Sequence, residues 1–442
     1  MNVLGVYISE ATLWAMVVGV VSNVACAVLG CHLVLRRLSL LGDAISHAVL
    51  PGIVIGYLLS GSVGVLTMLA GAWCAAILTS ALTDTLSRYG NVPEDASMGV
   101  VFTSLFALGV VLVSRYARNV HIDADCVLYG LIDTAALDAV PLAGWYVPRV
   151  LLTLVPVLVV TLVFLAVFWK ELKLSSFDPA LAAALGFRPG LVHYLFMGMV
   201  ATVTVASFEA VGSILVIAML IVPAATAQLL TDRLLWMVLL AACVGAVSAV
   251  VGCWGAALWN TSAAGMMAVV AGGQFAVAVC LAPRYGLLSK AWHTWQLGLR
   301  IVGEDVMARL FRAEESAHAA SKGTAAAALP RSPAGDIARL AGGAVVGRLA
   351  LARLWWRGDV AYRPDAGLTL TDSGRRLAQM LVRGHRLWES YLGEHFALPL
   401  DHLHEPAERL EHFLGPQLQE QLAEQLAEPG RDPHGRAIPP ST

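Results

Sequence analysis

Charged residues are scarce in this chain and account for only 14% of its 442 amino acids. Soluble domains carry charge on about a quarter of their residues, so the shortage argues against a purely water-soluble fold. Hydrophobic residues make up 58% of the sequence instead, which is typical of a membrane protein. The net charge of −2 gives no reason to expect nucleic acid or another strongly charged partner.

Three further features are missing. All seven cysteines lie before residue 281 without paired spacing, so neither a disulfide framework nor a zinc ribbon is predicted. No GxxxxGK[ST] motif occurs, so we expect the chain to bind no nucleotide itself. The first residues, MNVLGVYISE, lack the basic start of a signal peptide, so we expect no cleaved leader.

What remains is divided into two parts. Residues 1–290 are long apolar runs broken by short polar loops, whereas residues 300–442 are rich in Arg, Glu, His and Gln. A membrane-spanning helix needs roughly 20 apolar residues. The candidate spans are 11–35, 40–60, 64–84, 97–114, 149–169, 190–207, 209–230, 234–254 and 263–283. We predict an all-α polytopic membrane domain of eight or nine helices, followed by a mainly α soluble domain.

Basic residues mark alternate ends of these spans, as at Arg36–Arg37, Arg88, Lys170, Arg233 and Arg284. Loops rich in Lys and Arg face the cytoplasm. The soluble domain follows such a loop, so we expect it to be cytoplasmic.

One span carries an acid and a histidine, in LGDAISHAVLPG at residues 41–52. Asp43 and His47 are four residues apart and so share one face of a helix. A carboxylate with an imidazole suits Mn²⁺, Fe²⁺ or Zn²⁺. Alternatively, Asp43 caps its helix and His47 is its hydrogen-bond partner. The residues alone leave both interpretations open.

The membrane half resembles the permease family of bacterial manganese, zinc and iron ABC importers. The matching segments are LVLRRLSLLGDAISHAVLPGIVIGYLL, EDASMGVVFTSLFALGVVL, ELKLSSFDPALAAALGF and EAVGSILVIAMLIVPAATAQLLTDR. The resemblance implies that Asp43 and His47 contact the metal as it passes through the plasma membrane. It also implies a separate ATPase, an extracytoplasmic metal-binding protein, and a dimer with a second copy or a related permease. Many relatives have Asp-His where this chain has Asp125–Cys126, so we assign no metal role to 121–126.

Residues 171–190 form the longest polar break in the membrane half. Asp178 can cap a short helix with Pro179 in its first turn, ending near Gly186. From the residues alone this is an ordinary loop. The family resemblance implies a coupling helix that docks on the ATPase, formed by Asp178, Ala182, Leu185 and Gly186.

The beginning of the soluble part, residues 300–380, predicts a winged helix. A helical stretch, VVGRLALARLWWRGD, precedes the strand-like VAY, and GLTLTDSGRRLAQMLV continues with a strand and a helix capped by Thr371 or Asp372. The helix around 343–357 is rich in Ala and Trp. A helix that reads DNA is expected to be polar, so we do not expect DNA binding.

The end of the chain, residues 381–442, combines histidines with acids. His385 and Glu389 are at i and i+4, and we expect His404, Glu408, Glu411 and His412 to share one face of one helix. An isolated pair of this kind is usually a solvated helix face, but two sets favour a divalent-metal site. Carboxylates and imidazoles without cysteine favour Mn²⁺ or Fe²⁺ over structural zinc.

This region resembles the iron- and manganese-dependent (DtxR-like) repressor family over about 368–439. The matching stretches are LTLTDSGRRLAQMLVRGHRLWESYL, HLHEPAERLEHFL and RDPHGRAIP. The resemblance implies a metal-binding and dimerisation domain. It implies one site from His385, Glu389 and His404 and a second from Glu408, Glu411 and His412. Asp305 aligns with a further ligand, and Glu408, where iron-type members have Cys, favours Mn²⁺.

We therefore predict the permease subunit of an ABC importer for divalent metal, Mn²⁺ above Fe²⁺ or Zn²⁺, with a metal-sensing cytoplasmic tail. It is not an enzyme in this interpretation, because ATP is hydrolysed by the partner. A zinc or iron importer and a membrane-tethered metal-dependent transcription regulator are the alternatives.

Overall fold

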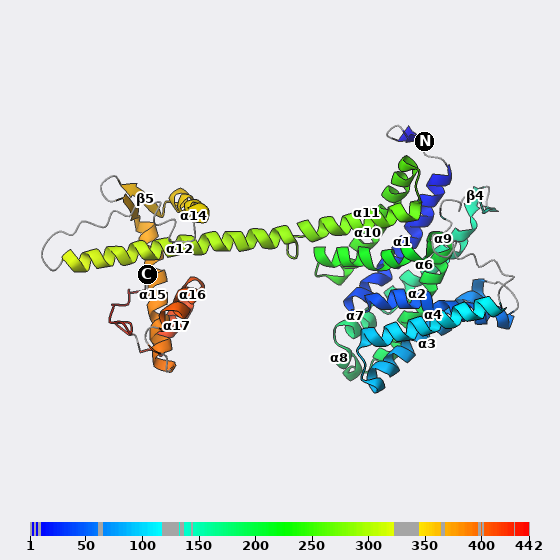
Figure 1. Cartoon of the computed structure of the whole chain (residues 1–442), viewed down its shortest axis with the longest axis horizontal. Coiled ribbons are helices and arrows are strands. Elements are labelled where there is room, and N and C mark those ends of the chain that lie inside the picture. Colours follow the sequence, from blue (N-terminus) through cyan, green and yellow to red (C-terminus); the bar gives the residue numbers. More distant parts are fainter. Residues whose placement is uncertain are drawn as a thin grey trace. The chain divides into compact units, whose positions relative to one another are not determined.

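The computed structural model describes residues 2–3, 6–7, 10–60, 65–116, 132, 137–142, 145–321, 344–363, 367–396, 399, 402–427 and 429–441. They fold into two compact units, Met1–Ser289 and Lys290–Thr442 (Figure 1). The prediction of a helical membrane domain followed by a mainly helical second domain is confirmed.

The first unit is built from apolar helices and two short hairpins. The helices are α1 (Glu10–Leu35), α2 (Ser39–Ser60), α3 (Val65–Gly90), α4 (Glu94–Tyr116), α6 (Arg149–Val167), α7 (Trp169–Phe177), α8 (Pro179–Ala184), α9 (Pro189–Leu230), α10 (Leu234–Trp259) and α11 (Ala263–Leu281). The hairpins are β1 (Asn2–Val3) with β2 (Val6–Tyr7), and β3 (Ala139–Leu142) with β4 (Trp145–Pro148).

Among the described residues, seven helices are long and apolar enough to cross a membrane. Two further apolar stretches, His47–Ser60 and Leu215–Leu230, are shorter. The predicted count of eight or nine spans is therefore slightly above the seven that meet the length. The helix α9 continues for 42 residues, which at about 1.5 Å per residue is twice the hydrocarbon thickness. It breaks at Gly212, whose φ of 77° suits glycine, so the chain changes direction there.

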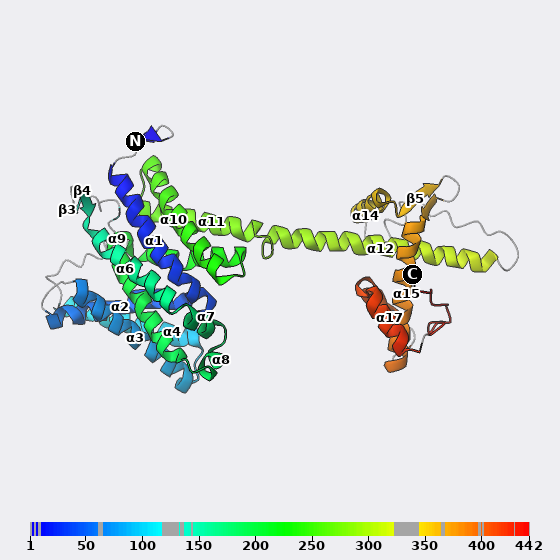
Figure 2. The same cartoon turned by 180° about the vertical axis from the view of Figure 1, so that it is seen from behind.

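The centre of the membrane unit is the packing of α1 against α9 and α10 (Figures 1 and 2). Leu29 and Leu33 of α1 and Phe196 of α9 are buried in one continuous core. At Gly30 a methyl group would lie 1.7 Å from the carbonyl oxygen of Leu220. Only glycine allows the two helices to approach so closely.

The helix α2 packs against α3 and α4. Gly52 of α2 and Gly71 of α3 face each other, because a methyl group on either would lie 2.2 Å from the carbonyl oxygen of the other. Small residues at such a crossing let van der Waals contacts hold helices together where no water drives association. This contact positions the helix that carries the predicted Asp43 and His47.

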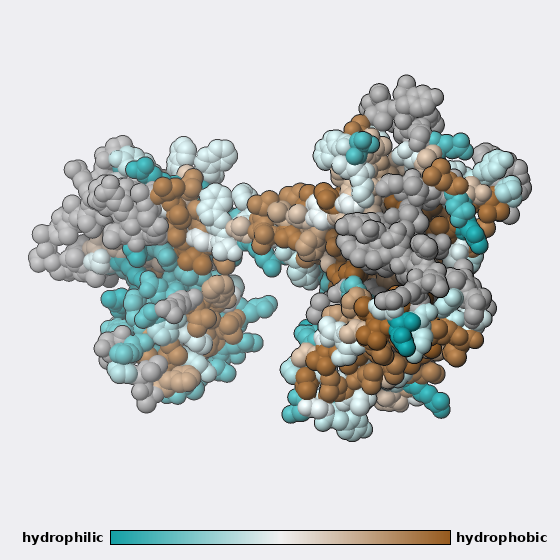
Figure 3. Space-filling view, turned by 45° about the vertical axis from the view of Figure 1, so that its right-hand side comes forward, coloured by the Kyte–Doolittle hydropathy of each residue, from teal (hydrophilic) through white to brown (hydrophobic). Residues whose placement is uncertain are grey.

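Much of the visible surface of the first unit is hydrophobic (Figure 3). On α6, for example, Val159, Val160 and Val163 are exposed. Lipid chains can cover such side chains, because the backbone polar groups are already satisfied within the helix.

The second unit consists of α12 (Leu287–Ser321), which crosses the boundary, α14 (Ala344–Arg357), β5 (Val360–Arg363), β6 (Gly367–Leu370), α15 (Asp372–His395), α16 (His404–Leu410), a 3₁₀ turn η3 (Glu411–Phe413) and α17 (Pro416–Gln425). Its core includes Val306, Leu354, Val360 and Ala378.

A hairpin follows α14, as the winged-helix pattern predicts. Strands β5 and β6 are antiparallel, with Val360 opposite Leu370. The helix α15 begins where the Thr371 hydroxyl accepts a hydrogen bond from the Gly374 N–H at 3.2 Å. Thr371, and not Asp372, is therefore the N-cap.

Candidate metal centres

The predicted pathway residues lie on α2. The side chain of Asp43 is outside the described residues, as is the whole 121–126 segment. The His47 ring is half-buried and lies against α4, stacked on Phe102 at 6.2 Å and edge-on to Phe106 at 5.4 Å between ring centroids. His47 thus points into the interface between α2 and α4, and that packing orients its ring.

The predicted coupling segment forms a short helix, α8. The Asp178 carboxylate caps it by accepting a hydrogen bond from the Leu181 N–H at 2.9 Å, and Pro179 occupies the first turn. Gly186, with a φ of 86°, ends it. Ala182 is buried, whereas Leu181 and Leu185 are exposed. The segment therefore presents apolar side chains outward on a helix fixed at both ends.

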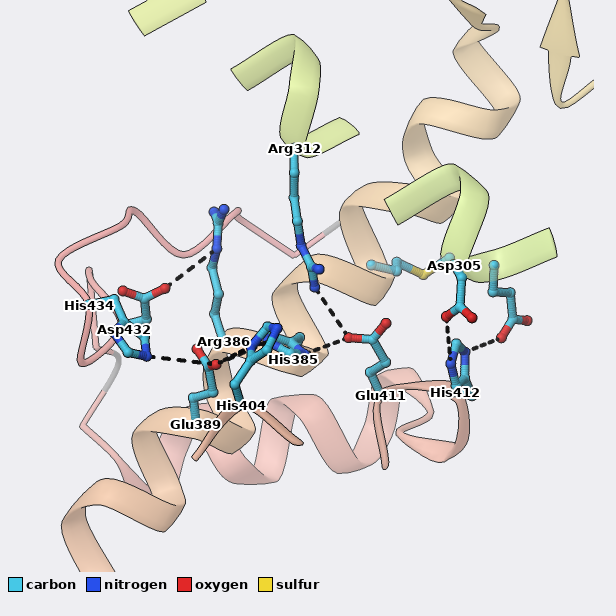
Figure 4. Close-up of polar contacts among 12 residues, drawn as sticks. Asp305, Arg312, His385, Arg386, Glu389, His404, Glu411, His412, Asp432 and His434 are labelled. Carbon is cyan, nitrogen blue, oxygen red and sulfur yellow. Dashed lines mark hydrogen bonds and ion pairs between the residues drawn. The ribbon is translucent and has the colours of Figure 1, made fainter. Parts of the chain in front are cut away.

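The first cluster of potential ligands in the second unit joins α15 to α16 (Figure 4). His385 Nε2 lies 3.0 Å from Glu389 Oε1 and 3.0 Å from His404 Nδ1. His404 Nδ1 is 2.9 Å from the same carboxylate oxygen. His385 and Glu389 are buried, while His404 is exposed. Two nitrogens and one oxygen thus converge at one point. A cation can reach this point from solvent on the side of the exposed His404.

The second cluster joins α12 to η3. Asp305, Glu411 and His412 each offer a ligand atom, and these atoms lie within 4.8 Å of one another. His412 Nε2 is 3.1 Å from Asp305 Oδ1, and its Nδ1 is 2.8 Å from Glu304 Oε2. The carboxylates outnumber the imidazole here, so this donor set fits a hard or borderline cation such as Mn²⁺.

The two clusters are connected through one short contact. His385 Nδ1 lies 2.6 Å from Glu411 Oε2, so the imidazole stands between Glu389 and Glu411 (Figure 4). Arg312 approaches the same Glu411 oxygen at 3.4 Å. A change of charge in one cluster therefore alters the electrostatic potential at the ligand atoms of the other.

The electrostatics of the clusters follow from these contacts. Burial alone would raise the pKa of Glu389, but hydrogen bonds from His385 and His404 outweigh it and lower the pKa to about 2. Burial alone would lower the pKa of His412, but its bonds to Asp305 and Glu304 raise the pKa to about 9. At neutral pH the protonated His412 is a counter-charge of Asp305 and Glu304, a role that a bound cation can take over.

One expectation about the second set is wrong. His404, Glu408, Glu411 and His412 do not share one α-helix, because α16 ends at Leu410 and the chain tightens into η3. Pro416 follows closely and cannot continue an α-helix, and short 3₁₀ turns commonly end helices. Glu408 is exposed, and the clusters found among the described residues do not include it.

Sequence reasoning missed two residues beside the clusters. Glu304 precedes the predicted Asp305 and contacts His412 directly. His434 Nε2 lies 3.9 Å from Glu389 Oε1. The signal for His434 was its place in RDPHGRAIP, whereas nothing in the spacing marks Glu304 as different from other helix-surface acids.

Comparison with known proteins identifies both units. Residues 8–282 match the model of the ABC 3 transport family. The chain belongs to this family. With seven helices able to span a membrane among its described residues, it is a multi-pass membrane permease. Residues 371–440 match the metal binding and dimerisation domain of iron dependent repressors, so the permease carries a repressor-like domain at its end.

Curated relatives of the permease carry different metals in their names. The manganese transport system membrane protein MntD of Bacillus subtilis is 45% identical over 64% of this chain and 95% of that protein. The zinc transport system membrane protein TroD of Treponema pallidum is 44% identical over 63% of this chain and 76% of that protein. The solved structure of PsaBC from Streptococcus pneumoniae in complex with Fab matches with a TM-score of 0.54 and 29% identity, over 63% of this chain and 94% of that chain.

The raised pKa of His412 predicts that metal binding competes with a proton. Its ring is protonated at pH 7 and must lose that proton to coordinate. We expect the Mn²⁺ affinity of the second centre to rise between pH 7 and pH 9 by about tenfold per pH unit for each proton released. Calorimetric Mn²⁺ titration of the purified full chain at several pH values measures this slope. His412→Gln should lose this dependence of Mn²⁺ affinity on pH, and the exposed His395→Gln should keep it. A flat profile in the unmodified chain would contradict His412 as a ligand of the second centre.

Proposed function

We propose that this permease is the transmembrane subunit of an ABC importer for Mn²⁺, and that its second unit is a cytoplasmic metal sensor that feeds back on transport. The observation that carries the proposal is the joining, in one chain, of an ABC 3 transport unit to two carboxylate–imidazole centres. The 45% identity to a manganese permease supports the ion, and oxygen-rich centres without cysteine suit it. Zinc or iron import is the second candidate, favoured by the 44% identity to a zinc permease.

In this proposal Asp43 and His47 contact the metal cargo on its way through the membrane. The support is their i, i+4 spacing on α2 and the position of His47 in the interface with α4. Ionisable groups at membrane depth are costly and commonly line a pathway. The proposed partner permease, a second copy or a relative, completes that pathway, and an extracytoplasmic binding protein delivers the ion.

A separate ATPase drives the transport and docks on α8. The exposed side chains of Leu181 and Leu185, with Phe177 just before the helix, offer it an apolar surface. Asp178, Ala182 and Gly186 hold that surface in place through the cap, the buried contact and the left-handed turn described above.

The sensor has two proposed parts, a winged-helix-like part at 300–380 and a metal-binding, dimerisation-like part at 381–442. His385, Glu389 and His404 hold one cation, and Asp305, Glu411, His412 and Glu408 hold the other, Glu408 after turning inward. Asp305 belongs to α12, the helix that leads on from the membrane unit, and His412 belongs to η3. A cation shared by the two fixes α12 against the rest of the sensor, and in our proposal the metal-bound tails dimerise and hold the permease at rest.

The second unit acts without reading DNA in this proposal. The exposed face of α14 carries Val345, Leu349, Trp355 and Trp356, although Arg348, Arg353 and Arg357 lie on the same helix. Contacts to phosphates and base edges need a polar surface. Specific operator binding by the full chain would instead support the membrane-tethered regulator.

His47→Ala should abolish Mn²⁺ uptake in cells that lack their own importers, because the pathway loses a ligand. Since the ring also packs on Phe102, His47→Phe is the sharper variant: it keeps a ring in the interface and removes both nitrogens. We expect both to lower uptake at least about tenfold, while the exposed His395→Ala transports normally. Normal uptake by His47→Phe would refute the ligand role.

A Glu408→Gln/Glu411→Gln double variant should keep transport at low Mn²⁺ and lose its shut-off at high Mn²⁺. The amides preserve the side-chain shape but remove the charge that binds the cation, so we expect the threshold for shut-off to rise about a hundredfold. The exposed Glu424→Gln of α17 is the matched control. Uptake assays over a range of Mn²⁺ concentrations measure the threshold at which transport shuts off. An unchanged threshold in the double variant would exclude the sensor role.

Leu185→Asp should separate the permease from its ATPase, since a charge on the exposed face of α8 cannot enter an apolar cleft without large cost. The measurement is co-purification of the ATPase with the full chain from membranes, where we expect at least about tenfold less ATPase. Leu418→Asp, also exposed but on α17, should leave the complex intact. Undiminished co-purification would show that α8 is not the docking element.

A further inference from the structure

One apolar stripe runs along α12. Its members recur at helical spacing, one or two turns apart on the same face: Leu288, Trp292, Trp295, Leu299, Val302 and Val306. The polar residues Lys290, His293 and Arg300 lie on other faces of the same turns, together with the apolar Leu297, whereas Gln296 borders the stripe. The helix is therefore amphipathic from its first turn onward.

Only the later half of this stripe is covered by the second unit. Val306 is fully buried in the core with Leu354 and Val360, and Val302 packs against it. Toward the beginning of the helix the cover is lost: Leu299 is half-buried, and Trp292 and Trp295 are 54% and 47% exposed. The two indole rings lie together, 5.7 Å apart and edge to face. A paired, exposed tryptophan cluster at this position needs another cover.

We infer that the first four turns of α12 lie on an anionic lipid surface, with the stripe in the membrane interface. The membrane-spanning α11 ends at Leu281 and α12 begins at Leu287. Five connecting residues span at most about 18 Å, so the stripe starts within reach of the headgroups. Its apolar surface is thus continuous along the chain with a surface already covered by lipid.

The side chains fit this partner. Tryptophan is enriched where membranes meet water, because its ring has an apolar body and a polar N–H. Lys290 and Arg300 lie on the polar side of the helix, where Arg300 also pairs with Glu304 at 2.7 Å, and their long side chains can extend toward lipid phosphates when the helix lies parallel to the membrane. Arg284, between α11 and α12, adds a third basic group at the same level of the chain.

This contact goes beyond metal transport and sensing and depends on neither. It restricts the orientation of α12 at the membrane, so the helix that contributes Asp305 begins on a surface instead of in free solution. The lipid surface then limits the orientations that the metal-binding unit can adopt.

Photo-crosslinking on the full chain tests the inference. The chain is reconstituted in vesicles of phosphatidylcholine with phosphatidylglycerol, and a benzophenone amino acid replaces Trp295 or, as the matched control, Gln296. Gln296 is the next residue and is also exposed, and it lies about 100° around the helix from Trp295, at the edge of the stripe. Val277, exposed on α11, verifies reconstitution. We expect about fivefold more lipid adduct at 295 than at 296, and less at 295 when phosphatidylglycerol is left out.

Three results would contradict the inference in whole or in part. Equal, low lipid labelling at 295 and 296 with strong labelling at 277 would leave the stripe outside the membrane. Crosslinks from 295 to a second copy of the chain would assign the stripe to a protein contact. Labelling that does not respond to phosphatidylglycerol would overturn the preference for an anionic surface.

Discussion

The membrane unit depends on the close approach of α1 to α9 and α10. Gly30 lets the α1 backbone reach Leu220, and Asn23 ties α1 to α10 by donating to the Gly245 carbonyl oxygen at 3.3 Å. At the end of α1, Arg36 donates to Ser175 and Ser176 of α7 at 2.8 and 3.0 Å. The helix at the centre of the unit thereby also fixes the element that leads into α8, so a force on α8 is transmitted to the packed core.

The second unit is organised around a different constraint, the burial of carboxylates. Glu389 and Glu411 are almost fully buried and need positive partners. His385 stands between them, with Arg312 beside Glu411. A cation in either centre would change the charge that surrounds His385, so the two centres are coupled by shared charge and not only by proximity.

The helix α12 brings the two constraints together in one element. Its beginning carries an apolar face without cover in the described part of the second unit, its middle contributes Asp305 and Glu304, and its later turns contribute Arg312 to Glu411. The chain passes from the membrane-spanning α11 to the metal centres through this one helix, after a short connection at 282–286.

Local pattern and composition were enough to predict several features of this chain. Long apolar runs required helices in a membrane, Asp178 with Pro179 predicted the cap of α8, and i, i+4 spacing brought His385 to Glu389. Only the tertiary structure decided which distant groups meet. Glu304 reaches His412, His385 links the two clusters, and Glu408 is exposed on α16, which ends at Leu410 before Glu411 and His412. Glu304 and His412 are 108 positions apart, and such contacts follow from how whole helices pack, a property that no local spacing encodes.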